Sequence, residues 1–176
     1  MPEILIHRIL RDGTVVSIVF SAFVIGSFLI EPSMWIDDYP PDIRAALEDA
    51  PRASPIFQTV VGGLFLLTLL TLLTRSTRRY VRASSSPGTA GAWLHALLLI
   101  QFVNLWDVVV LDWLFFVTIQ PDFVVYPGTE GMAGYSDYAF HFQASVLEPG
   151  VWAGAIAVSL GVAAFARWRE RGRVAA

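Results

Sequence analysis

Four long apolar runs constrain this chain of 176 residues more than any other feature of its sequence. They cover residues about 14–30, 56–74, 93–119 and 151–168. A helix rises about 1.5 Å per residue, so roughly 20 apolar residues cross the hydrocarbon core of a bilayer. Charged residues make up only 15% of the chain, against roughly 25% in soluble domains. The runs therefore predict an all-α membrane protein with four transmembrane helices.

The distribution of arginine predicts how these helices are oriented. All but two of the twelve basic residues lie before the first run, between the second and third runs, or at the end of the chain. Segments 31–55 and 120–150 carry most of the acidic residues and only Arg44 and Arg52. Because cytoplasmic segments of membrane proteins are enriched in basic residues, we expect both termini and residues 75–92 in the cytoplasm. Segments 31–55 and 120–150 are then two external loops.

Together these patterns predict an antiparallel four-helix bundle that forms a single integral membrane domain over residues 1–176. We expect it in the inner or plasma membrane of the cell, surrounded by the lipid bilayer. Both external loops are expected to be structured, with a short surface helix at residues 41–48 that begins at a proline. Residues 83–91 are rich in serine and glycine, which predicts a flexible linker.

Two groups of small residues predict where helices approach one another closely. Ala153, Ala157 and Gly161 recur every four residues along the fourth run, and Gly62 and Gly63 lie in the second run. Small side chains let helix backbones approach one another in lipid, so we expect both groups at helix contacts. We also expect a homodimer or a partner membrane subunit in any transport role, since four spans seldom form a complete transporter.

The third run carries polar residues where hydrocarbon is expected. These residues are Gln101, Asn104, Asp107 and Asp112, with Trp106 directly before Asp107. On an α-helix the first four fall within an arc of about 140° on one side. Carboxylates are costly in a bilayer and usually face a protein interior or a water-filled cavity, which predicts an outward-opening pocket. The alternative is that Asn104 and the two aspartates only bond other helices and hold the bundle together.

The second external loop carries five further candidate site residues. They are Glu130, Tyr135, Asp137, Tyr138 and His141. Ser136 is a candidate N-cap for a helix that begins here. Asp137 and His141 would then lie four residues apart on one face, where a carboxylate can orient an imidazole as a base or a metal ligand. The alternative is an ordinary helix pair at the membrane boundary, with the tyrosines in the interfacial belt.

The loop continues directly from the third run, so we expect its acids and its histidine to converge with Asp112 at the outer mouth of the pocket. Glu130, Asp137, His141 and Asp112 offer oxygen and nitrogen ligands that would suit a divalent metal. The helical H-E-x-x-H arrangement typical of zinc enzymes is missing from the sequence. The sequence therefore predicts no metal site.

Three functions fit these patterns. The first is binding of a small molecule or lipid in the outward-facing polar pocket, with Asn104, Asp107 and Asp112 under a lid formed by the second loop. The second is an enzyme on a lipophilic substrate, with Asp107 or Asp112 as general acid or base and His141 as partner. The third is an accessory subunit of a transporter or membrane complex, in which the polar residues contact another protein.

The composition also bears on cofactors and partners. The chain has no cysteine, which excludes disulfides, thiol redox chemistry and thiolate metal sites. It has no glycine-rich phosphate loop with lysine. The sequence identifies no cofactor. The arginines are explained by membrane topology, so they do not point to nucleic acid.

Overall fold

The computed structural model describes the backbone of residues 2–84 and 88–174 and the side chains of residues 5–84 and 88–170. Residues 85–87, in the middle of the predicted linker, lie outside the described part of the chain. All regular structure in the described part is helical. This confirms the prediction of an all-α protein.

Four helices are long and apolar enough to cross a membrane, as the sequence predicts. They are α1 (Pro2–Ile30), α3 (Pro55–Ala83), α4 (Thr89–Trp106) continued by η2 (Asp107–Ile119), and α6 (Pro149–Val174). The third of these changes its winding within the apolar run, because η2 is a π-helix. The four helices make the chain a multi-pass membrane protein.

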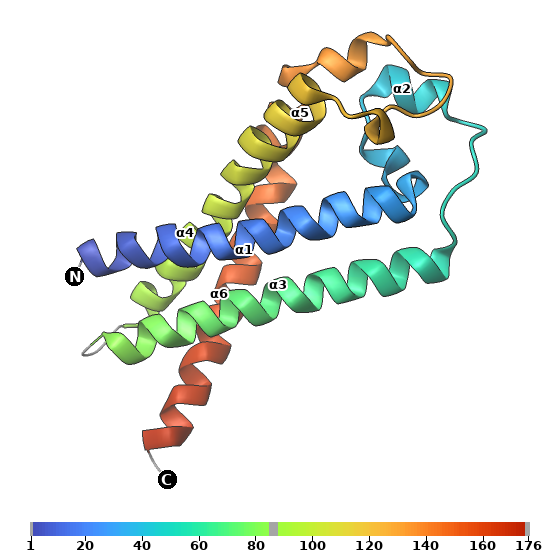
Figure 1. The fold of residues 1–176 in the computed structure, drawn as a ribbon. Helices are drawn as coiled ribbons and strands as arrows, with labels where there is room; N and C mark the ends of the chain where they lie inside the picture. Colours follow the sequence, from blue (N-terminus) through green and yellow to red (C-terminus); the bar gives the residue numbers. More distant parts are fainter. Residues whose placement is uncertain (1, 85–87, 175–176) are drawn as a thin grey trace.

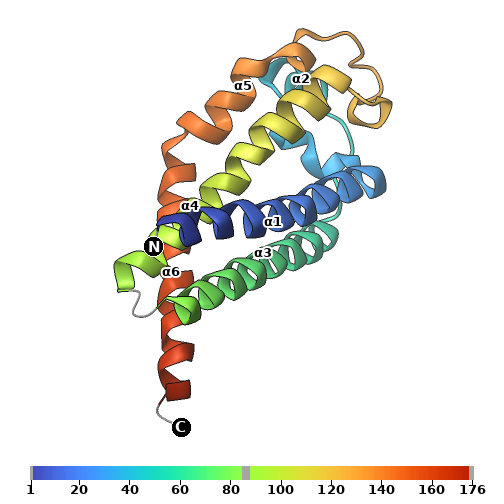
Figure 2. The ribbon, with the colours of Figure 1, turned by 60° about the vertical axis from the view of Figure 1, so that its left-hand side comes forward.

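The helices form a splayed bundle. Figures 1 and 2 show α1 and α3 side by side, with α4 packed against α6 and crossing the first pair. We call the end where α1 runs into η1 (Pro32–Asp38) and η2 runs into η3 (Asp122–Val124) the loop end. The opposite end holds both termini and the connection from α3 to α4, and we call it the arginine end.

Polar side chains join the helices near the arginine end. The buried carboxylate of Asp12 on α1 accepts a hydrogen bond of 2.7 Å from Ser76 on α3 and pairs with Arg11 at 2.7 Å. Thr77 on α3 lies 3.3 Å from Nδ1 of His95 on α4, and both side chains are fully buried. A buried polar group is costly unless it is paired, so these contacts fix how α3 packs on α1 and α4.

Short helices from the two long connections lie across the loop end (Figure 1). They are η1, α2 (Pro41–Ala46), η3 and η4 (Ala133–Ser136). The Tyr39 hydroxyl donates to the Val124 carbonyl at 2.6 Å, and the Gly134 amide donates to Asp42 Oδ2 at 2.9 Å. These bonds tie the first connection to the second. The α2 helix confirms the predicted short surface helix, with Pro41 at its first position.

The prediction for the small residues was wrong. Ala153, Ala157 and Gly161 face outward on α6, and a Cβ added at Gly62 or Gly63 would meet no atom within 4 Å. The inward face of α6 is a different stripe, made by Ala155, Ser159, Val162, Ala163 and Ala166. This stripe is also small, and it is the one that packs against α4 and α3. Spacing alone could not distinguish two small faces on the same helix.

The two connections pack so closely at Gly134 that one added methyl group there should lower the stability of the protein. A Cβ at Gly134 would collide with the Asp42 carboxylate and lie 2.8 Å from Cβ of Pro40. We expect Gly134→Ala to lower the free energy of unfolding by about 1–3 kcal/mol, as overpacking does. Thermal unfolding in detergent measures the effect.

Gly63→Ala is the matched control, because its Cβ meets open space on a helix. Alanine favours a helix over glycine by up to about 1 kcal/mol, so this variant should be neutral or slightly stabilised. Equal loss of stability in both variants would contradict the packing described for Gly134.

Candidate functional site

A cavity of about 260 Å³ lies at the loop end, between α1, η1, η2 and the segment formed by α5 (Tyr138–Phe142) and η5 (Gln143–Leu147). Three carboxylates and one imidazole line it. They are Asp38, Asp107, Asp112 and His141. Two come from the third span, and the others from the two connections. The structure thus brings Asp107 and Asp112 of the third span to one cavity with His141, which lies further along the chain.

The rest of the wall is mainly aromatic. The rings belong to Phe20, Phe28, Trp35, Tyr39, Phe65, Phe116, Tyr135 and Phe140. Phe28 and Trp35 stack with centroids 5.3 Å apart and planes 6° apart, and Tyr39 meets Tyr135 edge-on at 5.9 Å. Aromatic pairs in these geometries hold each other in place, so the wall is largely formed before any ligand arrives.

The π-helical winding of η2 explains how Asp107 and Asp112 come to share the cavity. On an α-helix these two residues would point about 140° apart. A π-helix instead bonds each residue to the one five positions on, which stacks residue i close to residue i+5. The last such bond runs from the Gln120 amide to the Phe115 carbonyl at 3.0 Å, and Gln120 ends the helix with a φ of 47°. Nothing in the apolar pattern of the run signals this winding.

Asp112 and His141 form the closest ionisable pair in the cavity. Asp112 Oδ1 lies 3.3 Å from His141 Nδ1, and the two side chains are 13% and 17% exposed. The sequence suggested Asp137 as the partner of His141, but the Asp137 carboxylate accepts a hydrogen bond of 2.9 Å from the Phe140 amide. Asp137 is therefore the N-cap of α5, and the expectation that Ser136 has this role was wrong.

Asp107 occupies a deeper position than its neighbour. It lines the cavity and also a second hollow of about 190 Å³ between α1, α3 and α4. Within the described residues, no hydrogen bond or ion pair satisfies its carboxylate. The charged group that interacts with this carboxylate is Asp112, and the two repel each other when both are ionised. A carboxylate in this position favours a cationic or hydrogen-bond-donating group beside it.

The other polar residues of the third span join it to its neighbours. The Asn104 side-chain amide donates to the Ser145 carbonyl at 2.8 Å and also borders the second hollow. Trp106 donates to Ser21 on α1 at 3.1 Å. Oε1 of Gln101 is buried and has no partner in the described part of the chain. For Asn104 this geometry agrees with the alternative of a purely structural role.

The remaining candidates in the 120–148 segment are dispersed. Tyr135 lies in the cavity wall, while the Tyr138 hydroxyl lies 2.9 Å from Thr118 on the exposed surface. Glu130 is also exposed, and hydrogen bonds from its own amide and from Gly128 lower the pKa of its carboxyl. Glu130 and Asp137 thus do not join Asp112 and His141. In the described residues, no three histidine or acidic side chains group closely enough to hold a metal.

Sequence reasoning missed Asp38 and Tyr39. Asp38 marks the rim of the cavity, where neighbouring protein atoms displace part of its hydration and, together with the charge of Asp37, raise the pKa of its carboxyl. Burial raises the pKa of Tyr39, and Tyr135 and Tyr126 add to the effect. The available signal was the double proline directly after Tyr39, which restricts Tyr39 to an extended backbone and so ends η1 at Asp38.

The geometry predicts an energetic coupling between Asp112 and His141. In a double-mutant cycle on the free energy of unfolding, Asp112→Asn and His141→Gln should be non-additive by about 0.5–3 kcal/mol, as contacting residues are. Thermal or denaturant unfolding in detergent provides the four stabilities.

Asp137→Asn with His141→Gln is the matched control cycle. Asparagine also caps helices, so α5 should persist, and the two changes should add within about 0.5 kcal/mol. If the Asp137 cycle showed coupling and the Asp112 cycle were additive, Asp137 and not Asp112 would be the partner of His141.

The scan against protein-family models and the searches of curated proteins and of solved structures found no match to this chain. What the site does therefore has to follow from its own residues. These residues form an aromatic cavity with three carboxylates and one imidazole on its wall.

Proposed function

We propose that this chain is a four-span protein with both termini in the cytoplasm and that its cavity opens outward and binds a lipophilic small molecule that carries a cationic group. The arginines of the arginine end support this orientation through the positive-inside rule. The loop end, with its excess of acidic residues, is then external. Consecutive spans running in opposite directions form the antiparallel bundle that the sequence predicts.

The observation that carries the proposal is the shared cavity of Asp107 and Asp112. Both aspartates border a cavity between helices of the chain instead of pointing only toward lipid. Ionisable residues in a membrane span are rare and usually belong to a pathway or a site. Their position favours a pocket within the chain over a contact with a second membrane subunit.

The size of the cavity decides between a small molecule and a lipid. Its volume of about 260 Å³ lies just below the range of roughly 300–1,000 Å³ typical of ligand pockets. Such a space suits a molecule of one or two rings. A phospholipid with two acyl chains is far too large for it.

The chemistry of the wall favours a cation. Three carboxylates face the cavity against a single histidine, and eight aromatic rings surround them. Aromatic faces attract organic cations, most strongly where water is excluded. A bound cation also relieves the repulsion between Asp107 and Asp112. An anionic ligand would add to that repulsion.

A pair of matched probes tests the proposal. We expect benzyltrimethylammonium to bind the wild-type protein in nanodiscs at least about tenfold more tightly than its neutral isostere neopentylbenzene, because one ion pair with cation–π contacts contributes about 1.4 kcal/mol or more. Asp112→Asn should remove most of this preference. Calorimetric titration measures both affinities.

Each probe partitions into the nanodisc lipid to the same extent with the wild type and with the variant. Comparing the two proteins therefore removes this contribution from the measured preference. Asp137→Asn is the control, since its carboxylate caps α5 and does not line the cavity. Equal affinity for both probes in the wild type, or an unchanged preference in Asp112→Asn, would disprove the cation site.

The Asp112–His141 pair favours a second candidate function, an integral membrane enzyme on a lipophilic substrate. A carboxylate within 3.3 Å of an imidazole can orient it as a general base.

Mass spectrometry of molecules that co-purify with the protein separates the two functions. A binding protein should retain the same compound in wild type and in His141→Gln, in a smaller amount in Asp112→Asn.

An enzyme should give a different result in the same experiment. His141→Gln would then retain an unconverted substrate that differs covalently from the compound found with the wild type. This outcome would replace the binding function with the catalytic one.

A further inference from the structure

Another, larger hollow lies away from the cavity. It is a groove of about 850 Å³ between α3 and α6, near the arginine end. Four arginines of α3 line it, and they are Arg75, Arg78, Arg79 and Arg82. The remainder is lined mainly by apolar residues of both helices, together with Thr71 and Thr74 of α3. The groove thus has one basic part and one apolar part.

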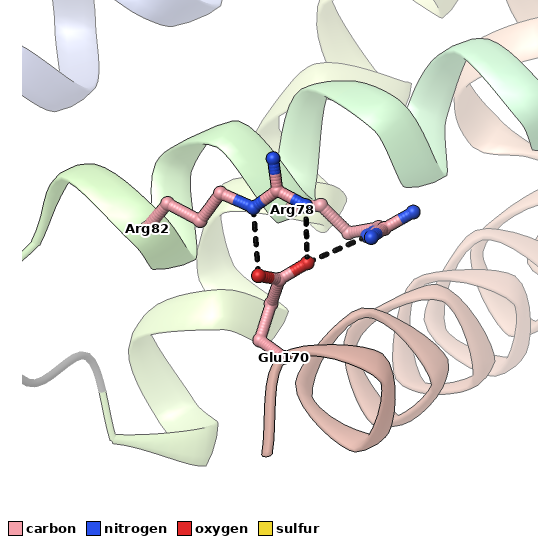
Figure 3. A network of polar contacts seen from close by, with 3 residues as sticks. All are labelled: Arg78, Arg82 and Glu170. Atoms are coloured by element: carbon pink, nitrogen blue, oxygen red, sulfur yellow. Dashed lines mark hydrogen bonds and ion pairs between the residues drawn. The ribbon is translucent and has the colours of Figure 1, made fainter. Parts of the chain in front are cut away.

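A single carboxylate partly neutralises the arginines. Figure 3 shows the guanidinium groups of Arg78 and Arg82 directed at Glu170 of α6. The bonds measure 2.8 Å from Arg78 Nε, and 2.7 and 2.9 Å from Nε and Nη2 of Arg82. Glu170 uses one N–H of Arg78 and two of Arg82, so most donors of both groups remain for another acceptor.

Arg75 and Arg79 add two further charges, and that of Arg79 also interacts at longer range with the buried Asp12 carboxylate of α1. Both are exposed, and neither forms an ion pair with an acidic residue of the described chain. Four guanidinium groups therefore line the groove, against the Glu170 carboxylate across it and the more distant Asp12 carboxylate of α1. This excess of positive charge and of N–H donors is suited to a phosphate group, which guanidinium binds through paired hydrogen bonds.

The apolar part continues from the arginines toward the membrane interior. Arg75 directly follows the apolar run of residues 56–74, so it stands where hydrocarbon gives way to headgroups. Leu70 on α3 and Val158 and Phe165 on α6 line the groove. At about 1.5 Å per residue, Leu70 lies roughly 7–8 Å deeper than Arg75. A ligand that fills the groove needs a charged end and an apolar chain.

We infer that this groove binds one anionic phospholipid, with its phosphate on the arginines and an acyl chain along Leu70 and Phe165. A free phosphate would leave the apolar part open. A second copy of the chain, related by a two-fold axis, would bring two sets of like charges together. In the proposed orientation the groove faces the cytoplasmic leaflet, where anionic lipids carry the negative surface potential. The inference does not depend on what the external cavity binds.

Native mass spectrometry of the full chain from nanodiscs tests the lipid site. We expect the wild type to retain one phosphatidylglycerol in preference to phosphatidylcholine of the same acyl chains. Each juxtamembrane arginine contributes roughly a fivefold factor in affinity for anionic lipid. Arg75→Gln should therefore lose about fivefold, and Arg75→Gln with Arg79→Gln roughly 30-fold.

Two further variants sharpen the test. Arg52→Gln removes an arginine at the loop end and should leave retention unchanged, since Arg52 lies outside the groove. Glu170→Gln frees Arg78 and Arg82 and should raise the affinity for phosphatidylglycerol, a gain that a misfolded protein would not show. Thermal unfolding confirms that the Arg75 and Arg79 variants fold, as expected for exposed side chains.

Three outcomes would overturn the inference. The first is equal retention of phosphatidylglycerol and phosphatidylcholine by the wild type. The second is unchanged retention in the variant that lacks both Arg75 and Arg79. The third is a dimer that binds no lipid and dissociates when these arginines are replaced, which would assign the groove to a second copy. If inorganic phosphate displaces the bound phosphatidylglycerol but retention of the lipid still depends on its acyl chains, that result supports a lipid as the ligand.

Discussion

The cost of placing charge in a bilayer governs the structure, because a carboxylate near the middle of a span costs about 2.5–3.5 kcal/mol or more. Nearly every acidic side chain of the described spans has a partner. Asp12 is paired with Arg11 and Ser76, Glu170 with two arginines, and Asp112 with His141. Asp107 has no such partner and stands between two hollows. The exception is thus a carboxylate that borders both hollows and has a free hydrogen-bonding capacity there.

The two ends of the bundle have opposite chemistry. The loop end gathers carboxylates among aromatic rings, and the arginine end gathers guanidinium groups beside an apolar groove. At each end, charges of one sign exceed those of the other, and the excess is available to a ligand. A cavity of about 260 Å³ and a groove of about 850 Å³ also select for size. The same physical rule therefore favours a small cation at one end and a phosphate-bearing lipid at the other.

Much of the fold could be predicted from the sequence, because hydrophobic length and the absence of strand periodicity leave few options for an apolar chain. The apolar runs predicted the four spans, and the proline pattern predicted α2. The inward face of α6 could not be predicted, since two of its faces carry small residues. Asp107 and Asp112 were evident as acids among apolar residues. Their alignment was not, because π-helical winding leaves no mark in composition.

The π-helical winding of η2 also gives the third span two ways to arrange the same residues. If one turn of η2 rewinds as an α-helix, everything beyond that turn rotates relative to what precedes it. Asp112 would then turn away from Asp107 while α4 stayed in place, and the bonds of Val124 and Gly134 to the first connection would oppose that turn. The winding of one helix and the shape of the cavity are therefore mechanically linked. A ligand held between Asp107 and His141 would clamp η2 in its present register, and its departure would release it.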